Sequence, residues 1–344
     1  ILKLTDEDYN EHGLSDLIIE QANSYELNIQ IFNRLQRTIT GWPGGKPNAD
    51  DSNRPERAKP AKKRVILFSP HPDDDVISMG GTFQRLVDQG HEVHVAYQTS
   101  GNIAVHDFDA LRYAEFMREF NAQQGTLDEK DAKRYEKIIH FLNTKDSGTP
   151  DIPEVRSIKG LIRRGEARGG ARFTGLQDKQ IHFLDMPFYE TGKTRQIPLD
   201  DADIKIIVDL MARVKPHQVF AAGDLADPHG THRVCLDAIF ESFRRLDNEA
   251  WMKDCWLWMY RGAWHEWAVH EIEMAVPMSP QQLRKKRQAI FMHQSQKDRA
   301  PFPGDDSREF WQRAEDRNKG TAQMYRDLGL AEYEAMEAFV RWKG

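Results

Sequence analysis

Cysteine is scarce in this chain of 344 residues, which has only two, Cys235 and Cys255. Neither belongs to a Cys-x-x-Cys pair, and this excludes a thiolate metal site and a framework of disulfides. Single cysteines of this kind are most often small buried residues. We therefore expect both to stay reduced and predict a cytoplasmic protein.

Long apolar runs and an excess of basic charge are also missing. No stretch approaches the roughly 18–20 apolar residues that a membrane helix needs, so we expect no membrane partner, and no apolar leader opens the chain. The 48 basic and 54 acidic residues give a net charge of −6, which argues against nucleic acid as a partner. The chain begins with Ile1 instead of methionine, so we expect sequence to be missing upstream.

The N-terminal part differs in composition from the remainder. Apolar residues at helical spacing, including Phe32 and Leu35, predict a helix. Proline, glycine and charged residues follow it at 41–60, which is typical of a linker or of an arm that lies on the surface. We interpret residues 1–62 as this helix and arm, and residues 63–344 as the compact domain.

Short apolar runs and helical patterns alternate from residue 64 onward. A strand at 64–69, a helix ending at Gly90 and a strand at 93–97 form a βαβ unit, which implies a parallel sheet. Charged helical sequence at about 103–160 interrupts the alternation, and we interpret it as a helical insertion over one face of the sheet. Further strands are predicted at 181–184, 219–222 and 256–260, with helices at 204–214 and 234–246.

The C-terminal segment, residues 281–342, is mostly helical in its pattern. At about 150 residues per domain, the length fits two domains or one large α/β domain with additions. Together these features predict the α/β class: a Rossmann-like three-layer domain with a mostly parallel sheet, a helical insertion and a helical C-terminal tail.

The first predicted strand leads into a dense set of metal-binding side chains. His71, Asp73, Asp74 and Asp75 lie within five residues, at the carboxyl end of a strand, where open α/β folds bind their ligands. Imidazole and carboxylate groups together suit zinc or a similar divalent ion. Aspartate is also favoured at helix N-caps, but a cap requires one Asp and no His. The pattern therefore predicts a metal site.

A second group of acidic and imidazole side chains follows the strand predicted at 219–222. It contains Asp224, Asp227, His229 and His232, and the two histidines, three positions apart, share one side of a helical turn. Such a pair offers one metal ligand and one acid–base group, although His-x-x-His also arises by chance. Two such loops at equivalent strand ends strengthen the prediction of one shared metal centre.

The two loops resemble the motifs of the LmbE-like (PIG-L) de-N-acetylase family. Pro-His-Pro-Asp-Asp at 70–74 is highly specific, and Asp-Pro-His-x-x-His at 227–232 is moderately so. This family includes zinc-dependent hydrolases that remove acetyl groups from N-acetylglucosamine conjugates. The resemblance implies that the metal ligands are His71, Asp74 and His232. It also implies that Asp73 is the general base and that His229 stabilises the oxyanion or protonates the leaving amine.

Three other segments resemble parts of the family outside the metal motifs. Arg163, in an Arg-x-x-Glu helix, matches an arginine that approaches the substrate, and Asp185, after a strand, matches a polar substrate contact. His293 begins a segment like the family's C-terminal His-x-x-Gln. It either lines the pocket or packs in the core, and packing is the preferred interpretation.

The sequence also departs from the family pattern. Asp75 stands where the family usually has Glu, and Gly230 and Thr231 fill a gap where many members have Asp. Asp224 or Asp227 would then orient His229, or the protonation of His229 is tuned differently. The helical insertion lies in a region that helps to build the substrate pocket in the family. The identity of the substrate is therefore the property that the resemblance predicts least well.

We therefore predict a zinc-dependent N-deacetylase that acts on a small N-acetylated amino sugar of the N-acetylglucosamine type, and whether this sugar is free, phosphorylated or conjugated stays open. Fe²⁺ is compatible with the same ligands. The start of the chain and residues 78–82 also resemble the C-terminal half of bacterial fusion proteins that begin with a glucosamine-6-phosphate deaminase-like domain. Such an upstream domain and a homo-oligomer are the protein partners that we consider. Two alternatives stay open: a noncatalytic module that binds sugar and metal, and a metal amidase acting on a non-sugar amide.

Overall fold

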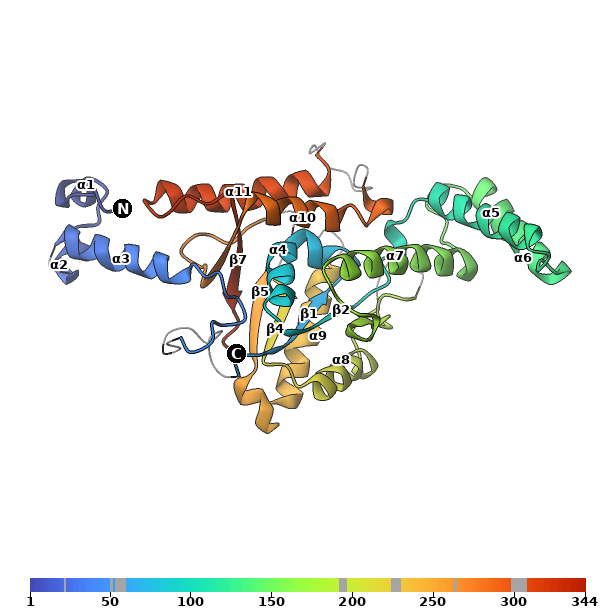
Figure 1. Ribbon diagram of the computed structural model, residues 1–344, viewed down its shortest axis with the longest axis horizontal. Helices are drawn as coiled ribbons and strands as arrows, with labels where there is room; N and C mark the ends of the chain where they lie inside the picture. Colours follow the sequence, from blue (N-terminus) through green and yellow to red (C-terminus); the bar gives the residue numbers. More distant parts are fainter. Residues whose placement is uncertain are drawn as a thin grey trace.

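The computed structural model describes residues 1–21, 23–49, 52, 60–191, 197–223, 230–262, 265–297 and 308–344. A sheet of seven strands in the order β3-β2-β1-β4-β5-β7-β6 forms its centre (Figure 1). Within these residues, no helix is both long enough and apolar enough to span a bilayer. The strands are β1 (Arg64–Ser69), β2 (Glu92–Tyr97), β3 (Ile181–Phe183), β4 (Gln218–Ala222), β5 (Trp256–Tyr260), β6 (Met274–Met278) and β7 (Ala335–Arg341).

The sheet is mostly parallel, as predicted. Strands β1 to β5 pair in parallel, and β7 is antiparallel to both of its neighbours, β5 and β6. The chain moves outward from β1 to β3 in one direction and from β4 to β5 in the other. The order therefore reverses between β1 and β4, and ligands bind at such a switch point in sheets of this kind.

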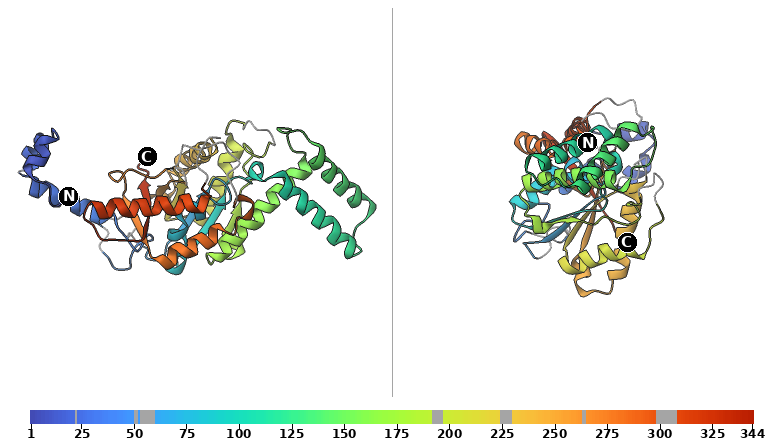
Figure 2. Two further views of the ribbon diagram at one scale, coloured as in Figure 1. Left: turned by 90° about the horizontal axis from the view of Figure 1, so that it is seen from above. Right: turned by 90° about the vertical axis from the view of Figure 1, so that its right-hand side faces the viewer.

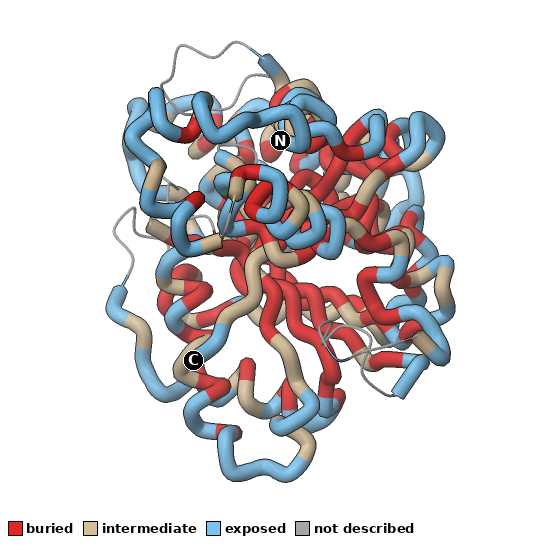
Figure 3. The backbone as a smooth tube through the Cα atoms, turned by 90° about the vertical axis from the view of Figure 1, so that its left-hand side faces the viewer, coloured by how far each residue is buried: buried red, intermediate tan, exposed pale blue. Residues whose placement is uncertain are grey.

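Helices cover both faces of the sheet, so the predicted three layers are confirmed. Successive side chains of a strand point to opposite faces. In β1, Val65 and Leu67 join one buried core, whereas Ile66 and Phe68 join the other, and the central strands are buried along their length (Figure 3). The first face is covered by α4 (Asp74–Asp88), α7 (Pro153–Phe173), α10 (Pro280–Ile290) and α11 (Phe310–Asp327), and the second by α8 (Asp201–Val214) and α9 (Thr231–Leu246).

Local sequence explains where two of these helices begin. At α8, the Asp200 side chain accepts a hydrogen bond from the Asp203 N–H, and the Asp203 side chain accepts one from the Asp200 N–H. At α10, Ser279 and Gln282 form the same reciprocal pair, and Pro280 takes the first helical position. Both arrangements satisfy backbone donors that a helix start leaves free.

The predicted helical insertion consists of α5 (Asp107–Gln123), α6 (Glu129–Thr144) and the first half of α7. The prediction that it lies over one face of the sheet is wrong, because it projects from one end of the molecule (Figures 1 and 2). The long helix α7 contributes residues to two hydrophobic cores. Ala167 and Ala171 near its end pack on the sheet, whereas Val155 and Ile158 near its start pack with α5 and α6. The insertion therefore has a small core of its own.

The N-terminal residues form three helices where the sequence predicts one: α1 (Asp6–Glu11), α2 (Ser15–Gln21) and α3 (Ser24–Thr38). They lie at the end of the molecule opposite the insertion (Figure 2). The arm after α3 runs along the amino edge of the sheet, where Thr40 N–H donates to the Ala275 carbonyl at 2.8 Å and the Gln218 side chain donates to the Pro43 carbonyl at 3.1 Å. The start of the arm, at Thr40 and Pro43, thus contacts the sheet, and the domain boundary at residue 62 stays a prediction.

The C-terminal tail is helical only in part. Helices α10 and α11 agree with the prediction, but the chain then forms β7, which inserts between β5 and β6. The sequence analysis predicts neither β6 nor β7. The residues of β7, Ala-Met-Glu-Ala-Phe-Val-Arg, include good helix formers without strict alternation, so only pairing with the two neighbouring strands decides their structure.

Gly81 lies where α4 packs closely against β6. A Cβ atom at Gly81 would lie 2.2 Å from Sδ and 2.8 Å from Cγ of the buried Met278. We expect Gly81→Ala to lower the free energy of unfolding by about 1–3 kcal/mol, because the core must shift to admit the methyl group. Urea unfolding measures this. Gly320→Ala is the control: its Cβ meets nothing within 4 Å, so it should stabilise α11 by up to about 1 kcal/mol. Equal effects of the two substitutions would contradict the close packing.

Candidate metal centre

The candidate metal ligands come from two loops at the switch point of the sheet. β1 ends at Ser69 and α4 begins at Asp74, so His71 lies in the short turn between them. His232 is the second residue of α9, which follows β4. Because β1 and β4 are parallel neighbours, their carboxyl ends meet at one edge. Gly230, just before α9, has φ of 71°, a conformation that glycine adopts without strain.

The three predicted ligands form one cluster. Asp74 Oδ2 lies 3.3 Å from His71 Nδ1 and 3.2 Å from His232 Nε2, and the ligand atoms of the three residues all lie within 4.8 Å of one another. Zinc binds such atoms at about 2.0–2.2 Å, so neighbouring ligands of a tetrahedral ion lie roughly 3.3–3.5 Å apart. The donor set and the two distances to Asp74 therefore fit zinc. Within the described part of the chain, no other group of three or more His, Cys, Asp or Glu side chains forms such a cluster.

Asp74 is held by hydrogen bonds as well as by the histidines. Its Oδ2 also accepts a hydrogen bond from the His71 backbone N–H at 2.9 Å. Burial by itself raises the pKa of the Asp74 carboxyl, but the adjacent His232 and His71 outweigh it and hold this pKa below its ordinary value. An ionised carboxylate between two imidazoles is the form that binds a divalent cation.

Asp73 turns away from the cluster. Its Oδ1 lies 3.2 Å from Arg163 Nη2, and Arg163 Nη2 also donates to the Pro72 carbonyl. Both side chains are buried. Burial raises the pKa of Asp73 to about 6, and the Arg163 guanidinium acts against this rise. The backbone of Asp73 has φ of 133°, a region that residues with a Cβ rarely enter and that costs about 1–3 kcal/mol.

Asp75, which stands where the family usually has Glu, faces the protein interior. Its Oδ2 accepts a hydrogen bond from the Tyr97 hydroxyl at 3.0 Å, and its backbone N–H donates to Ser69 Oγ at 3.1 Å. Burial raises the pKa of Asp75 to about 7. These bonds fasten the first turn of α4 to β1 and β2, so the shorter side chain still reaches a structural partner.

Asp185, a predicted substrate contact, lies outside the cluster. It lines a cavity of about 290 Å³ together with Ser100, Arg156, Arg164 and Glu190. Arg164 Nη2 lies 2.5 Å from Asp185 Oδ2, and the Glu190 carboxylate accepts hydrogen bonds from the Ser100 N–H and hydroxyl at 2.9 and 3.0 Å. The cavity is thus lined by both charged donors and charged acceptors, as suits a ligand with many hydroxyl groups.

Arg163, the other predicted substrate contact, contacts Asp73 and does not line this cavity. Its Nε and Nη1 atoms are buried and have no hydrogen-bond partner among the described residues. The sequence predicts an arginine near the substrate but contains no sign that this arginine holds the general-base candidate. Only the approach of α7 to the β1–α4 turn brings the two residues together.

Two further residues beside the cluster were not predicted as site residues. The Tyr189 ring meets the His71 ring edge-on with 6.0 Å between centroids, and the next residue, Glu190, lines the cavity near Asp185. No sequence signal marks Tyr189. His293 is buried and lines a small cavity that also includes Asp73, and burial lowers its pKa to about 3. The His-x-x-Gln segment is the sequence signal for His293, although the sequence analysis favours packing in the core for this residue.

The predicted catalytic His229 lies outside the described residues, as do Asp224 and Asp227. Its part in catalysis stays a prediction. The described residues on both sides of this segment are Gly223, which follows β4, and Gly230, which precedes α9.

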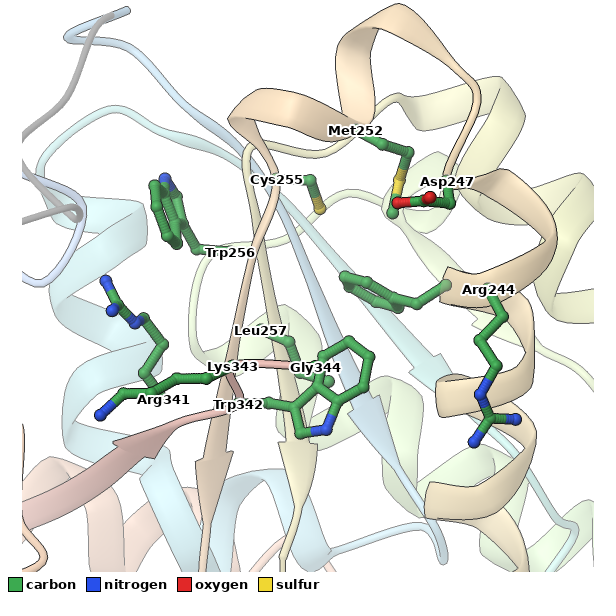
Figure 4. A pocket seen from close by; sticks show the side chains of 11 residues that line it. Arg244, Asp247, Met252, Cys255, Trp256, Leu257, Arg341, Trp342, Lys343 and Gly344 are labelled. Carbon is green, nitrogen blue, oxygen red and sulfur yellow. The ribbon is translucent and has the colours of Figure 1, made fainter.

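A larger cavity, of about 540 Å³, lies at the opposite edge of the sheet (Figure 4). The start of β5, the end of β7 and the end of α9 enclose it, and its lining includes Phe243, Cys255, Trp256 and Trp342. It contains no predicted site residue. In this fold the volume of a cavity alone therefore does not single out the predicted site residues.

The fold and the site together define an α/β protein with a candidate His-Asp-His metal centre at the switch point of its sheet. The chain belongs to the PIG-L family, because the sequence model of that family, described as GlcNAc-PI de-N-acetylase, matches residues 66–243. The resemblance inferred from the two motifs is therefore confirmed.

Two curated proteins are similar to this chain in sequence. A glucosamine-6-phosphate deaminase-like protein of Bacteroides thetaiotaomicron is 58% identical over 345 residues, which cover 99% of this chain and 52% of the relative. Diacetylchitobiose deacetylase of Thermococcus kodakarensis is 29% identical over 179 residues, 47% of this chain and 59% of the relative. The chain thus spans little more than half the length of these curated relatives.

A solved structure shows the same fold. N,N'-diacetylchitobiose deacetylase from Pyrococcus horikoshii superimposes with a TM-score of 0.53 at 21% sequence identity, covering 91% of this chain and 92% of the other. At this identity the similarity concerns the fold alone. The predicted fold class is confirmed by it and by the sheet.

Proposed function

We propose that this chain is a zinc-dependent hydrolase that removes the acetyl group from an N-acetylated amino sugar of the N-acetylglucosamine type. The observation that carries the proposal is the divergence of Asp73 from the cluster of His71, Asp74 and His232. Three protein ligands leave an open position on zinc, which is typical of catalytic sites. The carboxylate of Asp73 is not one of these ligands, so it is available for proton transfer.

In this proposal His71, Asp74 and His232 hold the metal. A zinc ion bound there supplies Lewis-acid chemistry, which polarises the amide carbonyl and makes water a better nucleophile. The donor set is also compatible with Fe²⁺. The family and the deacetylases among the relatives support the reaction class.

In this proposal, side chains of the protein carry out the proton transfers. Asp73 takes a proton from the attacking water, which is the role of a general base within hydrogen-bond reach of that proton. Arg163 holds the Asp73 carboxylate in place, because it is itself tied to the Pro72 carbonyl and buried. The nitrogen of the departing amine then needs a proton, for which Asp73 and His229 are the two candidates. Arg163 is thus first a residue that orients the base, and its contact with substrate stays a prediction.

The cavity at Asp185 is the proposed site for the sugar. Its volume of about 290 Å³ is near the lower end of the usual range for ligand pockets, roughly 300–1,000 Å³. Tyr189 and Glu190 connect it to the cluster, since Tyr189 meets His71 and Glu190 lines the cavity. The similarity to diacetylchitobiose deacetylase and to the glucosamine-6-phosphate deaminase-like protein supports an amino sugar as substrate and an associated deaminase-like domain.

Acetate release by zinc-reconstituted protein tests the reaction. The substrates are N-acetylglucosamine, N-acetylglucosamine 6-phosphate, N,N'-diacetylchitobiose and Nε-acetyl-lysine. We expect acetate from at least one sugar and none from acetyl-lysine, loss of release after chelation, and recovery with added zinc, or with Fe²⁺ under anaerobic conditions. Release from acetyl-lysine alone would favour a non-sugar amidase. Sugar binding without any release would favour a noncatalytic module and contradict the proposal.

A further inference from the structure

Helix α4, which begins at the ligand candidate Asp74, is broken at Met79. Met79 has φ of −137° and ψ of 28°, outside the helical range. In a continuous helix the Thr82 N–H would donate to the Ser78 carbonyl across this point. Here charged side chains from other elements bind both groups. Thr82 N–H donates to Glu337 Oε2 at 2.6 Å, and the Ser78 carbonyl accepts from Arg317 Nη2 at 3.0 Å.

Glu337 is the centre of a buried network at this break. It belongs to β7, and its Oε1 accepts hydrogen bonds from the Gly81 N–H at 2.9 Å and from Lys286 Nζ at 2.7 Å. Lys286 Nζ also donates to Asn318 Oδ1 at 2.7 Å. All of these side chains are buried. Three elements of the C-terminal segment, α10, α11 and β7, thus meet at the break in α4.

A buried charge network of this kind is poorly explained by stability alone. Removing charges from water is costly, and apolar residues of similar volume often stabilise a fold as well or better. Arg317 adds a second pair, since its Nε lies 3.4 Å from Glu266 Oε2. The network is better explained by the geometry that it imposes on α4, because it supplies partners to the very groups that the break leaves free.

The two halves of α4 have different supports. The first turn is fastened to the end of β1 and to β2 through Asp75, which bonds with Ser69 and Tyr97. The second half packs on β6 and α10 through glycines: a Cβ at Gly80 would lie 3.0 Å from Lys286 Cγ. The break lets each half follow its own support. If Glu337 or Arg317 were lost, the Thr82 N–H and the Ser78 carbonyl would be free to bond to each other, which would change the angle between the first turn and the second half of α4.

We propose that Glu337, Lys286 and Arg317 are positioning residues for the metal centre. They hold α4 broken at Met79 and so set the direction in which Asp73 and Asp74 leave the first turn. The inference rests on the proposed function, because it takes the cluster to be a metal site. It extends that function to the last strand of the chain, which contributes no ligand itself.

Glu337→Gln tests the inference through metal binding and not only through activity. We expect zinc affinity to fall by about tenfold or more, as is usual when the support of a metal ligand is lost. The visible spectrum of the cobalt-substituted protein should change as well, because it reports ligand geometry. In metal-free protein, amide hydrogen exchange should become faster in α4. All three measurements are made well below the unfolding temperature of the variant.

Asp151→Asn is the matched control. Asp151 accepts hydrogen bonds from Lys145 and the buried Lys159 at 2.6 and 2.7 Å, so the same change from carboxylate to amide disturbs an ion pair far from α4. It should leave zinc affinity and the cobalt spectrum unchanged. Arg317→Lys is the second variant if Glu337→Gln does not fold. It keeps the positive charge but withdraws Nη2 from the Ser78 carbonyl, and it should weaken zinc binding in the same direction.

Two results separate this inference from the proposed function. Wild-type affinity, spectrum and α4 exchange in Glu337→Gln, together with a loss of stability like that of Asp151→Asn, would show a purely structural network and overturn the inference. If the wild-type protein itself binds metal but releases no acetate from any sugar, the proposed function fails. Metal affinity and hydrogen exchange would still decide the positioning role.

Discussion

Asp73→Asn is expected to lower kcat for acetate release by about two to four orders of magnitude, because an amide cannot accept the proton of the attacking water. The metal should stay bound, since Asp73 contacts Arg163 and not the cluster of His71, Asp74 and His232. Steady-state kinetics on the best sugar of the panel, with metal content measured by mass spectrometry, provide both readouts. The pair of results distinguishes a lost base from a lost metal.

The substitution also removes the charged partner of Arg163, which is 1% exposed. Breaking a buried ion pair costs stability, so the melting temperature of Asp73→Asn must be measured and kinetics recorded well below it. Asp203→Asn is the control for burial. Asp203 is a fully buried carboxylate in α8, bonded to the Phe188 N–H at 3.0 Å, and its variant should keep wild-type kcat. Wild-type turnover by Asp73→Asn would show that the general-base assignment is wrong.

His232→Ala is expected to have the second large effect. It removes one of three ligands, and the binding free energies of zinc sites imply a loss of affinity of roughly a hundredfold or more. Activity at limiting zinc should fall with it. Competition with a chromophoric chelator measures the affinity, and excess zinc should restore only part of the turnover, because the ion would sit in an incomplete site.

His182→Ala is the control for the loss of an imidazole. The His182 ring stacks on His94 with 5.2 Å between centroids and belongs to no metal cluster of the described residues. Its variant should bind zinc as the wild-type protein does. Unchanged zinc affinity in His232→Ala would mean that the cluster does not hold the metal, and it would remove the basis of the proposed function.

The βαβ unit and the first metal motif were predictable because their signals are local. β1 is a run of apolar residues, α4 has apolar residues at helical spacing, and the motif from His71 to Asp74 lies between them. Residues that are so close in the chain are also close in the folded structure. The pairing of this motif with His232 followed from a general rule, that parallel strands have their carboxyl ends at one edge.

The partners of the motif residues were not predictable in the same way. Arg163 touches Asp73 only because α7 packs on the first face of the sheet, and Tyr189 reaches His71 from the segment after β3. The sequence suggested a role for Arg163 through a family motif, but no spacing in the chain shows which carboxylate it holds. Contacts between separate elements depend on packing, which a local pattern does not encode.

By itself the sequence determined the α/β class, the parallel core of the sheet and the candidate ligands His71, Asp74 and His232, because each depends on local pattern or on strand ends. Only the tertiary structure decided that the last residues form β7 in place of a helix and that Glu337 caps the broken helix α4. Residues Gly81 and Glu337 lie 256 positions apart. Their contact exists because β7 pairs with β5 and β6. The buried carboxylate of Glu337 needs hydrogen-bond donors, and the Gly81 N–H is one of them.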